Sequence, residues 1–133
     1  MNATRRREHR VAGLPEAISH YTDAVSARGL LFVSGIVSVD ADGVLVGPDD
    51  VVAQARRVFE IMGAVLADAC CSFADVVRIT VYLTDVDDRT RINPLRQRLF
   101  GETRPASTLV EVSRLAVPGA KVEIECVAAL PDA

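Results

Sequence analysis

Residues 76–83, "VVRITVYL", alternate apolar side chains with a second set that includes Arg78. Because the side chains of a strand point alternately to its two faces, this stretch predicts a β-strand with one apolar and one more polar face. Residues 121–130, "KVEIECVAAL", repeat the pattern and place Glu123 and Glu125 together on the polar face. A chain with two such strands is constrained to a sheet that buries only one of its faces.

The first half of the chain predicts a hairpin followed by a helix. Residues 24–38 contain two apolar runs separated by Arg28 and Gly29, a turn signal between paired strands. Apolar residues then recur at steps of three and four over residues 51–69. Either Asp49 or Asp50 can cap this stretch, which predicts one face of a helix of about five turns.

A second helix and another strand are predicted in the second half. Asp87, Asp88 or Thr90 can cap a helix that ends at Gly101, and residues 104–113, "RPASTLVEVS", alternate again. The predicted order is therefore β-β-α-β-α-β-β. This order indicates an α+β fold in which a mixed sheet carries two helices on one face.

Length and composition indicate one domain over residues 1–133. The basic residues 1–12 are predicted to be a flexible, solvated N-terminal segment. No apolar stretch is long enough for a signal sequence or a membrane span, and three cysteines without paired spacing fit a reducing compartment as small buried residues. A cytoplasmic location follows as an expectation.

The charge balance bears on possible partners. Fifteen Lys and Arg against eighteen Asp and Glu give a net charge of −3, which argues against a nucleic-acid partner. The scattered histidines and acids have no spacing typical of a zinc or iron site, so no metal is predicted.

The polar face of the sheet is predicted to face either water or a second subunit. Its expected members are Arg78, Thr80, Tyr82, Glu123, Glu125 and some of Ser107, Leu109 and Glu111.

Five stretches, in this order and with a helix between the second and third, resemble the RidA/YjgF family of reactive intermediate deaminases. They are "ISHYTDAV" (18–25), "LLFVSGIVSVD" (30–40), "VVRITVYLTDVDD" (76–88), "RPASTLVEVSRL" (104–115) and "KVEIECVA" (121–128). The resemblance implies a chorismate-mutase-like fold and a homotrimer whose sheets form a central barrel, with clefts between neighbouring subunits. It also implies hydrolysis of a small-molecule imine or enamine to release ammonia, without a metal or other cofactor.

The resemblance also implies site residues. Tyr21 matches a tyrosine that lines the cleft, and Glu123 matches the carboxylate proposed to hold the attacking water. The backbone at Ser34 and Gly35 matches a loop that approaches the substrate, Asn93 matches a polar helix residue near the cleft, and Leu109 matches a position whose backbone grips the substrate. Tyr21 can instead simply pack with a wet hydroxyl, and Glu123 can instead pair with a cation across a subunit interface.

Ser107 departs from the family pattern. The typical imine deaminase has an arginine at this position that makes two hydrogen bonds to the substrate carboxylate. A serine hydroxyl can supply only one neutral hydrogen bond in its place. We therefore expect small 2-imino acids to be poor substrates, as in a branch that lacks this arginine and includes aminomuconate deaminase. A longer or neutral imine would need another anchor, for instance Arg78 or Arg91 of a neighbouring chain.

Two further functions stay open at this level. The first is a non-catalytic trimer that binds a small metabolite or docks on a partner protein. The second is the ribonuclease activity of the older family label, against which the acidic charge balance argues.

Overall fold

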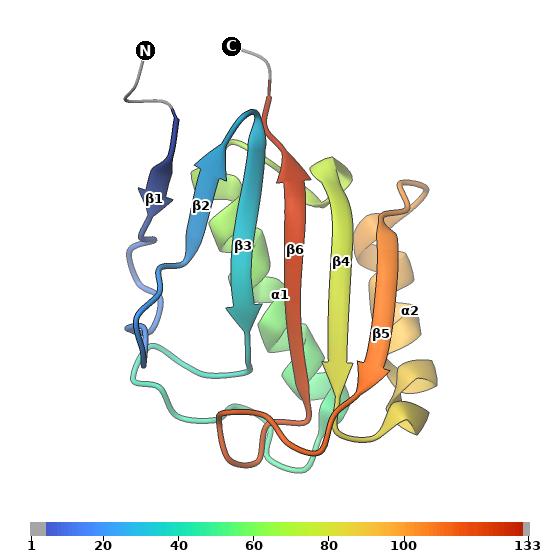
Figure 1. Cartoon of the computed structure of the whole chain (residues 1–133). Helices are drawn as coiled ribbons and strands as arrows, with labels where there is room; N and C mark the ends of the chain where they lie inside the picture. Colours follow the sequence, from blue (N-terminus) through green and yellow to red (C-terminus); the bar gives the residue numbers. More distant parts are fainter. Residues whose placement is uncertain (1–4, 132–133) are drawn as a thin grey trace.

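The computed structural model describes residues 5–131, which form a six-stranded mixed sheet and two α-helices (Figure 1). The strand order is β1-β2-β3-β6-β4-β5, and both helices lie behind the same face of the sheet. The predicted α+β fold is confirmed. The strands are β1 (Arg7–His9), β2 (Ala24–Ala27), β3 (Leu30–Ile36), β4 (Val76–Leu83), β5 (Ala106–Glu111) and β6 (Val122–Ala129), and the helices are α1 (Val51–Asp68) and α2 (Arg89–Phe100), with short 3₁₀ turns η2 (Phe73–Asp75) and η3 (Val86–Asp88).

Chain connections explain the mixed sheet. β2 and β3 form the predicted antiparallel hairpin, and β6 inserts between β3 and β4, antiparallel to both. β5 pairs in parallel with β4, because α2 carries the chain back across the helix-covered face before β5 begins. The last strand in the sequence therefore lies near the middle of the sheet.

Helix α1 packs its apolar stripe on the sheet, as its spacing predicts. Asp50 caps it by accepting a hydrogen bond from the Ala53 backbone N–H at 3.0 Å. Phe59 of α1 meets Phe73 and Phe100 edge to face, with ring centroids 6.1 Å apart in both pairs. These rings join the two helices into one layer. Neither helix within residues 5–131 is long and apolar enough to cross a lipid bilayer.

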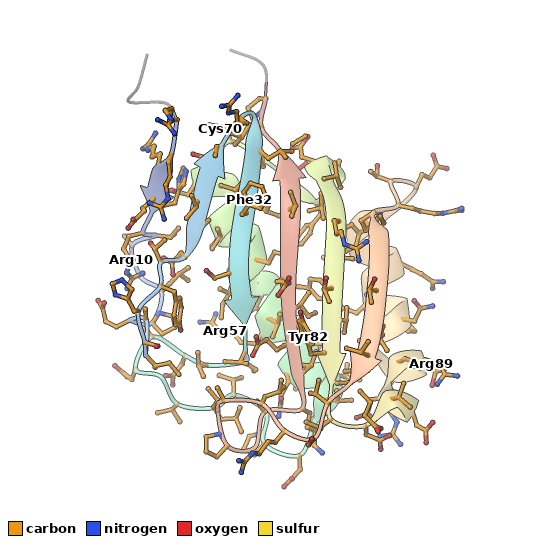
Figure 2. All side chains as sticks on the ribbon, in the orientation of Figure 1. Arg10, Phe32, Arg57, Cys70, Tyr82 and Arg89 are labelled. Carbon is orange, nitrogen blue, oxygen red and sulfur yellow. The ribbon has the colours of Figure 1, made fainter. Side chains whose placement is uncertain are left out.

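The opposite face of the sheet is open, and Figure 2 shows Phe32 and Tyr82 on it. The alternation places Arg78, Thr80 and Tyr82 of β4 there, beside Glu123 and Glu125 of β6, as predicted.

The predicted orientation of β5 is wrong. Thr80 pairs with Thr108, so Ala106, Thr108 and Val110 share the open face. Ser107, Leu109 and Glu111 lie on the helix side: Ser107 bonds to Arg96 of α2, and Leu109 packs against the buried core. Both alternating sets of this strand mix apolar and polar residues, so the pattern alone did not determine its orientation.

The N-terminal segment is more ordered than predicted. Arg7–His9 form edge strand β1 on β2, and buried His9 bonds through Nε2 to the Ser26 hydroxyl at 2.9 Å. The run of charged residues predicted a solvated tail. A charge pattern does not reveal whether the backbone pairs along the edge of a sheet. Residues 1–4 of the predicted flexible segment lie outside the described residues.

The cysteines follow the prediction at two positions of three. Cys71 and Cys126 are buried, and burial is the main cause that raises the pKa of the Cys126 thiol to about 12. Cys70 is exposed, because it lies in the turn that follows α1, with a positive φ of 61°.

Candidate active site

An ion pair organises the loop between β1 and β2. The Asp23 carboxylate accepts hydrogen bonds from the Arg10 guanidinium at 2.8 Å and from the Val11 backbone N–H at 2.7 Å. Arg10 also donates to the carbonyl oxygens of Leu14 and Pro15, both at 3.3 Å. This single arginine thus ties both ends of the loop together, and the loop carries Tyr21.

A cleft of about 370 Å³ opens between this loop, the end of β3 and the start of β6. Four residues predicted from the sequence line it together: Tyr21, Ser34, Gly35 and Glu123. A smaller hollow of about 100 Å³ continues from it toward α1 and shares Tyr21, Ser34 and Gly35. The remaining wall of the larger cleft consists of Ile18, Ser19, Val37, Ala116 and Val117.

Gly35 lies in close contact with the Glu123 side chain. The register between β3 and β6 shifts between Val33 and Ile36, as at a β-bulge. A Cβ atom on Gly35 would overlap Oε2 of Glu123. The absence of a side chain at position 35 therefore gives the carboxylate room to lie over the backbone of β3.

The Glu123 carboxylate is half-buried. Its pKa is raised, first by burial and second by the nearby charge of Glu125. Tyr82 donates its phenolic hydrogen to Glu125 at 3.2 Å, whereas Glu123 takes part in none of the side-chain hydrogen bonds formed within residues 5–131. Glu125 is thus bonded to the protein, and the oxygens of Glu123 are left for a water or a ligand.

The hydroxyl and the backbone N–H of Ser34 are both hydrogen-bonded within the chain. Its Oγ donates to the Thr22 carbonyl at 2.5 Å, and its N–H donates to the Asp23 carbonyl at 3.0 Å. These two bonds attach the Tyr21 loop to β3. Tyr21 itself is 49% exposed, and its phenolic oxygen accepts a long hydrogen bond from the Ile18 N–H at 3.4 Å.

The other three predicted site residues lie elsewhere in the chain. Asn93 is exposed on α2, and Ser107 and Leu109 are on β5, which β4 separates from β6. They share the α2 side of the sheet, whereas Glu123 is on the open face. One chain therefore does not bring these residues into the cleft with Glu123.

Two arginines named as possible substrate anchors are engaged within the chain. Arg78 donates to the Thr108 hydroxyl at 2.5 Å, and Arg91 pairs with buried Asp88 at 3.2 Å.

The sequence reasoning missed two other arginines. Arg10 was part of the predicted tail, and Arg96 is the residue that reaches Ser107. Arg96 follows Asn93 by three residues and therefore lies on the same side of the helix. This spacing was the one sequence feature that could have identified Arg96.

The cleft offers a limited set of chemical groups. A carboxylate with free oxygens, a phenol and strand backbone can position a water molecule and exchange a proton with it. Within residues 5–131, no Ser–His or Cys–His pair lines the cleft, and no group of three or more His, Cys, Asp or Glu side chains is placed to hold a metal ion. The arrangement suits addition of water to an electrophile that is already reactive.

Comparison with known proteins gives consistent matches over nearly the whole chain. The family model described as Endoribonuclease L-PSP matches residues 12–130. A RutC family protein of Synechocystis is 38% identical over 90% of this chain and 93% of its own. A goat protein named 2-iminobutanoate/2-iminopropanoate deaminase is 35% identical over 96% of this chain and 93% of its own. The crystal structure of YyfA, a Rid-family protein from Yersinia pestis, superposes with a TM-score of 0.88 at 32% identity, covering 94% of this chain and 99% of that one.

Proposed function

This chain belongs to the Endoribonuclease L-PSP family, which includes the RidA/YjgF proteins, and from this premise we propose that it hydrolyses the C=N bond of a reactive imine or enamine and releases ammonia. The observation that carries the proposal is the Glu123 carboxylate, which lies over Gly35 at the wall of the cleft with its oxygens free. The names of several relatives as 2-iminobutanoate/2-iminopropanoate deaminases support this chemistry.

The reaction needs one proton relay. Water adds to the carbon of an imine that is protonated on nitrogen, and Glu123 accepts a proton from that water as the new C–O bond forms. The same carboxyl group then returns this proton to nitrogen. As the C–N bond breaks, the carboxylate accepts the remaining hydroxyl proton and passes it to the departing ammonia, so that a protonated imine and one water yield a carbonyl compound and an ammonium ion. The raised pKa of Glu123 favours this return step, because the group holds a proton more readily than an ordinary glutamate.

The proposed active assembly is a homotrimer with a cleft at each subunit interface. Asn93, Ser107 and Leu109 would come from one chain, and Tyr21, Gly35 and Glu123 from its neighbour. Two observations support this division: the first three residues share a side of the sheet away from Glu123, and the open face exposes 46% of Phe32 and 40% of Val110. A second copy of the chain packed on this face would cover both side chains.

Substrate preference follows from Ser107. The family resemblance implies an arginine at this position, and this chain has a hydroxyl instead, so a small 2-imino acid would lose a forked, charge-assisted contact next to its reacting carbon. Such a contact contributes about 1.5 to 3 kcal/mol. We therefore propose a preference for larger imines or enamines over the smallest 2-imino acids.

Ammonia release from a panel of imines tests this proposal. An amino-acid oxidase would generate each imine in the reaction vessel, and both ammonia and the carbonyl product would be followed against the uncatalysed rate. We expect acceleration for at least one imine, with the smallest 2-imino acid among the slower ones. A protein that binds panel members without accelerating any of them is the non-catalytic trimer, and the proposal then fails.

A further inference from the structure

A guanidinium group from another element lies beside Ser107, the position at which the family resemblance implies an arginine. Nη2 of Arg96, in α2, is 2.9 Å from the hydroxyl oxygen of Ser107, in β5. Arg96 is partly buried, and that burial lowers its pKa. A partly dehydrated positive charge therefore lies beside Ser107, the position where the resemblance implies an arginine.

Arg96 has no acidic partner within the part of the chain that the structure describes. Arg10, Arg57, Arg89 and Arg91 all have a carboxylate oxygen within 4.0 Å, whereas no such pair involves Arg96 between residues 5 and 131. Helix α2 carries four arginines and no Asp or Glu.

The donors of Arg96 are also largely unused. A guanidinium has five N–H donors, and the Ser107 hydroxyl takes up one of them. Partial burial of a charge is costly unless the charge finds a partner. A planar donor group with a neighbouring hydroxyl matches the two oxygens of a carboxylate.

We propose that Arg96 and Ser107 together bind the carboxylate of the substrate, so that α2 supplies the cation that β5 lacks. The inference rests on the proposed function and adds a substrate class to it. The Arg96 side chain starts from α2, so its guanidinium lies on the α2 side of the Ser107 hydroxyl, whereas the side chain of an arginine at position 107 would start from β5. The carboxylate therefore binds nearer to α2, which selects imines whose carboxylate is separated from the C=N carbon by additional atoms.

The alternative is that Arg96 only holds α2 against β5. The two roles differ in what responds to ligand: a structural contact affects unfolding alone, whereas a binding site affects the affinity for carboxylates and spares neutral analogues of the same size.

Isothermal titration of the full chain with unbranched dicarboxylates, from malonate to adipate, separates these roles. We expect binding of at least one of them and no binding of the matching diamide. Arg96→Gln should weaken that binding by about tenfold or more, the size of a lost charge-assisted hydrogen bond. Arg98→Gln is the matched control, because Arg98 is an exposed arginine on the same helix, and its affinity should equal that of the wild type.

Two conservative variants keep the test valid if Arg96→Gln unfolds more easily. Arg96→Lys keeps the charge and loses the fork, so its binding should be intermediate. Ser107→Ala keeps the guanidinium and loses the hydroxyl, so it should retain most of the binding. Equal affinities in wild type, Arg96→Gln and Arg96→Lys, equal losses in the Arg96 and Arg98 variants, or no dicarboxylate binding in the wild type would each overturn the site.

Failure of this site is distinguishable from failure of the proposed function. Dicarboxylate binding that depends on Arg96, without hydrolysis of any imine, leaves the anion site standing and removes the proposed activity. Imine hydrolysis that is unaffected by Arg96→Gln for both carboxylated and neutral substrates leaves the activity standing and removes the anion site.

Discussion

At the scale of one residue, the environment of Glu123 destabilises the folded state while suiting a proton carrier. Its carboxylate is half-buried beside a second carboxylate, and no side-chain or backbone donor within residues 5–131 compensates for the lost water. The folded protein therefore favours the protonated form of this group more than the unfolded chain does. A proton carrier benefits from this environment, whereas the folded state is destabilised by it.

Glu123→Gln should accordingly make the chain more stable at neutral pH. Between the ordinary glutamate pKa and the raised pKa of folded Glu123, the folded state binds more protons than the unfolded state, so stability falls as pH rises. Glu123→Gln lacks this loss of stability. Its stability advantage over the wild type should disappear below pH 4.5, the ordinary pKa of a glutamate. Urea unfolding midpoints on both sides of that value measure the effect. The exposed Glu102 offers the control Glu102→Gln, and a wild type more stable than Glu123→Gln at neutral pH would contradict the account.

Gly35→Ala should separate activity from stability. The added methyl group overlaps the end of the flexible Glu123 side chain, which can move aside without unfolding the strand. A displacement of about 1 Å in a catalytic group can cost on the order of a hundredfold in rate, so we expect kcat/KM to fall by about that factor. Gly63→Ala in α1 is the control, because its Cβ would meet Phe73 at an ordinary 3.5 Å and should leave the rate unchanged. Equal activity in both alanine variants would show that the position of the Glu123 carboxylate does not matter.

At the scale of elements, periodicity predicted the parts of the chain where one face is clearly apolar. The α1 stripe and the polar faces of β4 and β6 are as expected, because burial on one side leaves a strong alternating signal. The orientation of β5 was predicted wrongly, because its more polar set, Ser107, Leu109 and Glu111, lies on the helix side. At this edge of the sheet Ser107 and Glu111 stay exposed, so burial did not select an apolar set for that side. The Arg10–Asp23 pair was missed for a different reason: it joins residues on either side of a loop, and no local pattern reports such a contact.

Arg10→Ala tests the role of this loop. Removing the guanidinium releases Asp23 and the loop that carries Tyr21, so KM should rise severalfold more than kcat falls. The loss in unfolding free energy should be no more than about 1 kcal/mol, because the Arg10 side chain is 38% exposed. Arg6→Ala, which breaks an ion pair between two well-exposed side chains on the same edge of the sheet, should change neither quantity. An Arg10 variant with wild-type kinetics would show that the loop is held without this ion pair.

At the scale of the whole molecule, a single chain holds only part of the proposed site. Four of the seven residues predicted from the sequence meet in one cleft, and Asn93, Ser107 and Leu109 lie across β4 on the other side of the sheet. Sequence patterns describe the chain, whereas a site shared between subunits depends on how copies meet. The family resemblance, rather than periodicity, supplied these three positions.

Light scattering of the purified protein should give three times the chain mass. Phe32→Glu places a charge on the apolar part of the open face, so it should yield monomers that have also lost hydrolysis. Val44→Glu alters an exposed valine outside the strands and should remain trimeric. A monomeric wild type that hydrolyses imines would refute the shared cleft.

The central claim is that Glu123 carries the proton from water to the departing nitrogen. The most direct measurement compares kcat/KM for ammonia release, across pH, in wild type, Glu123→Gln and Glu125→Gln. We expect Glu123→Gln to lose about a hundredfold to ten-thousandfold, the usual contribution of a general base. Glu125→Gln should stay active and keep its activity to lower pH, because removing the neighbouring charge lowers the pKa of Glu123. A Glu123→Gln protein that releases ammonia at a rate within a few fold of the wild type would contradict the claim.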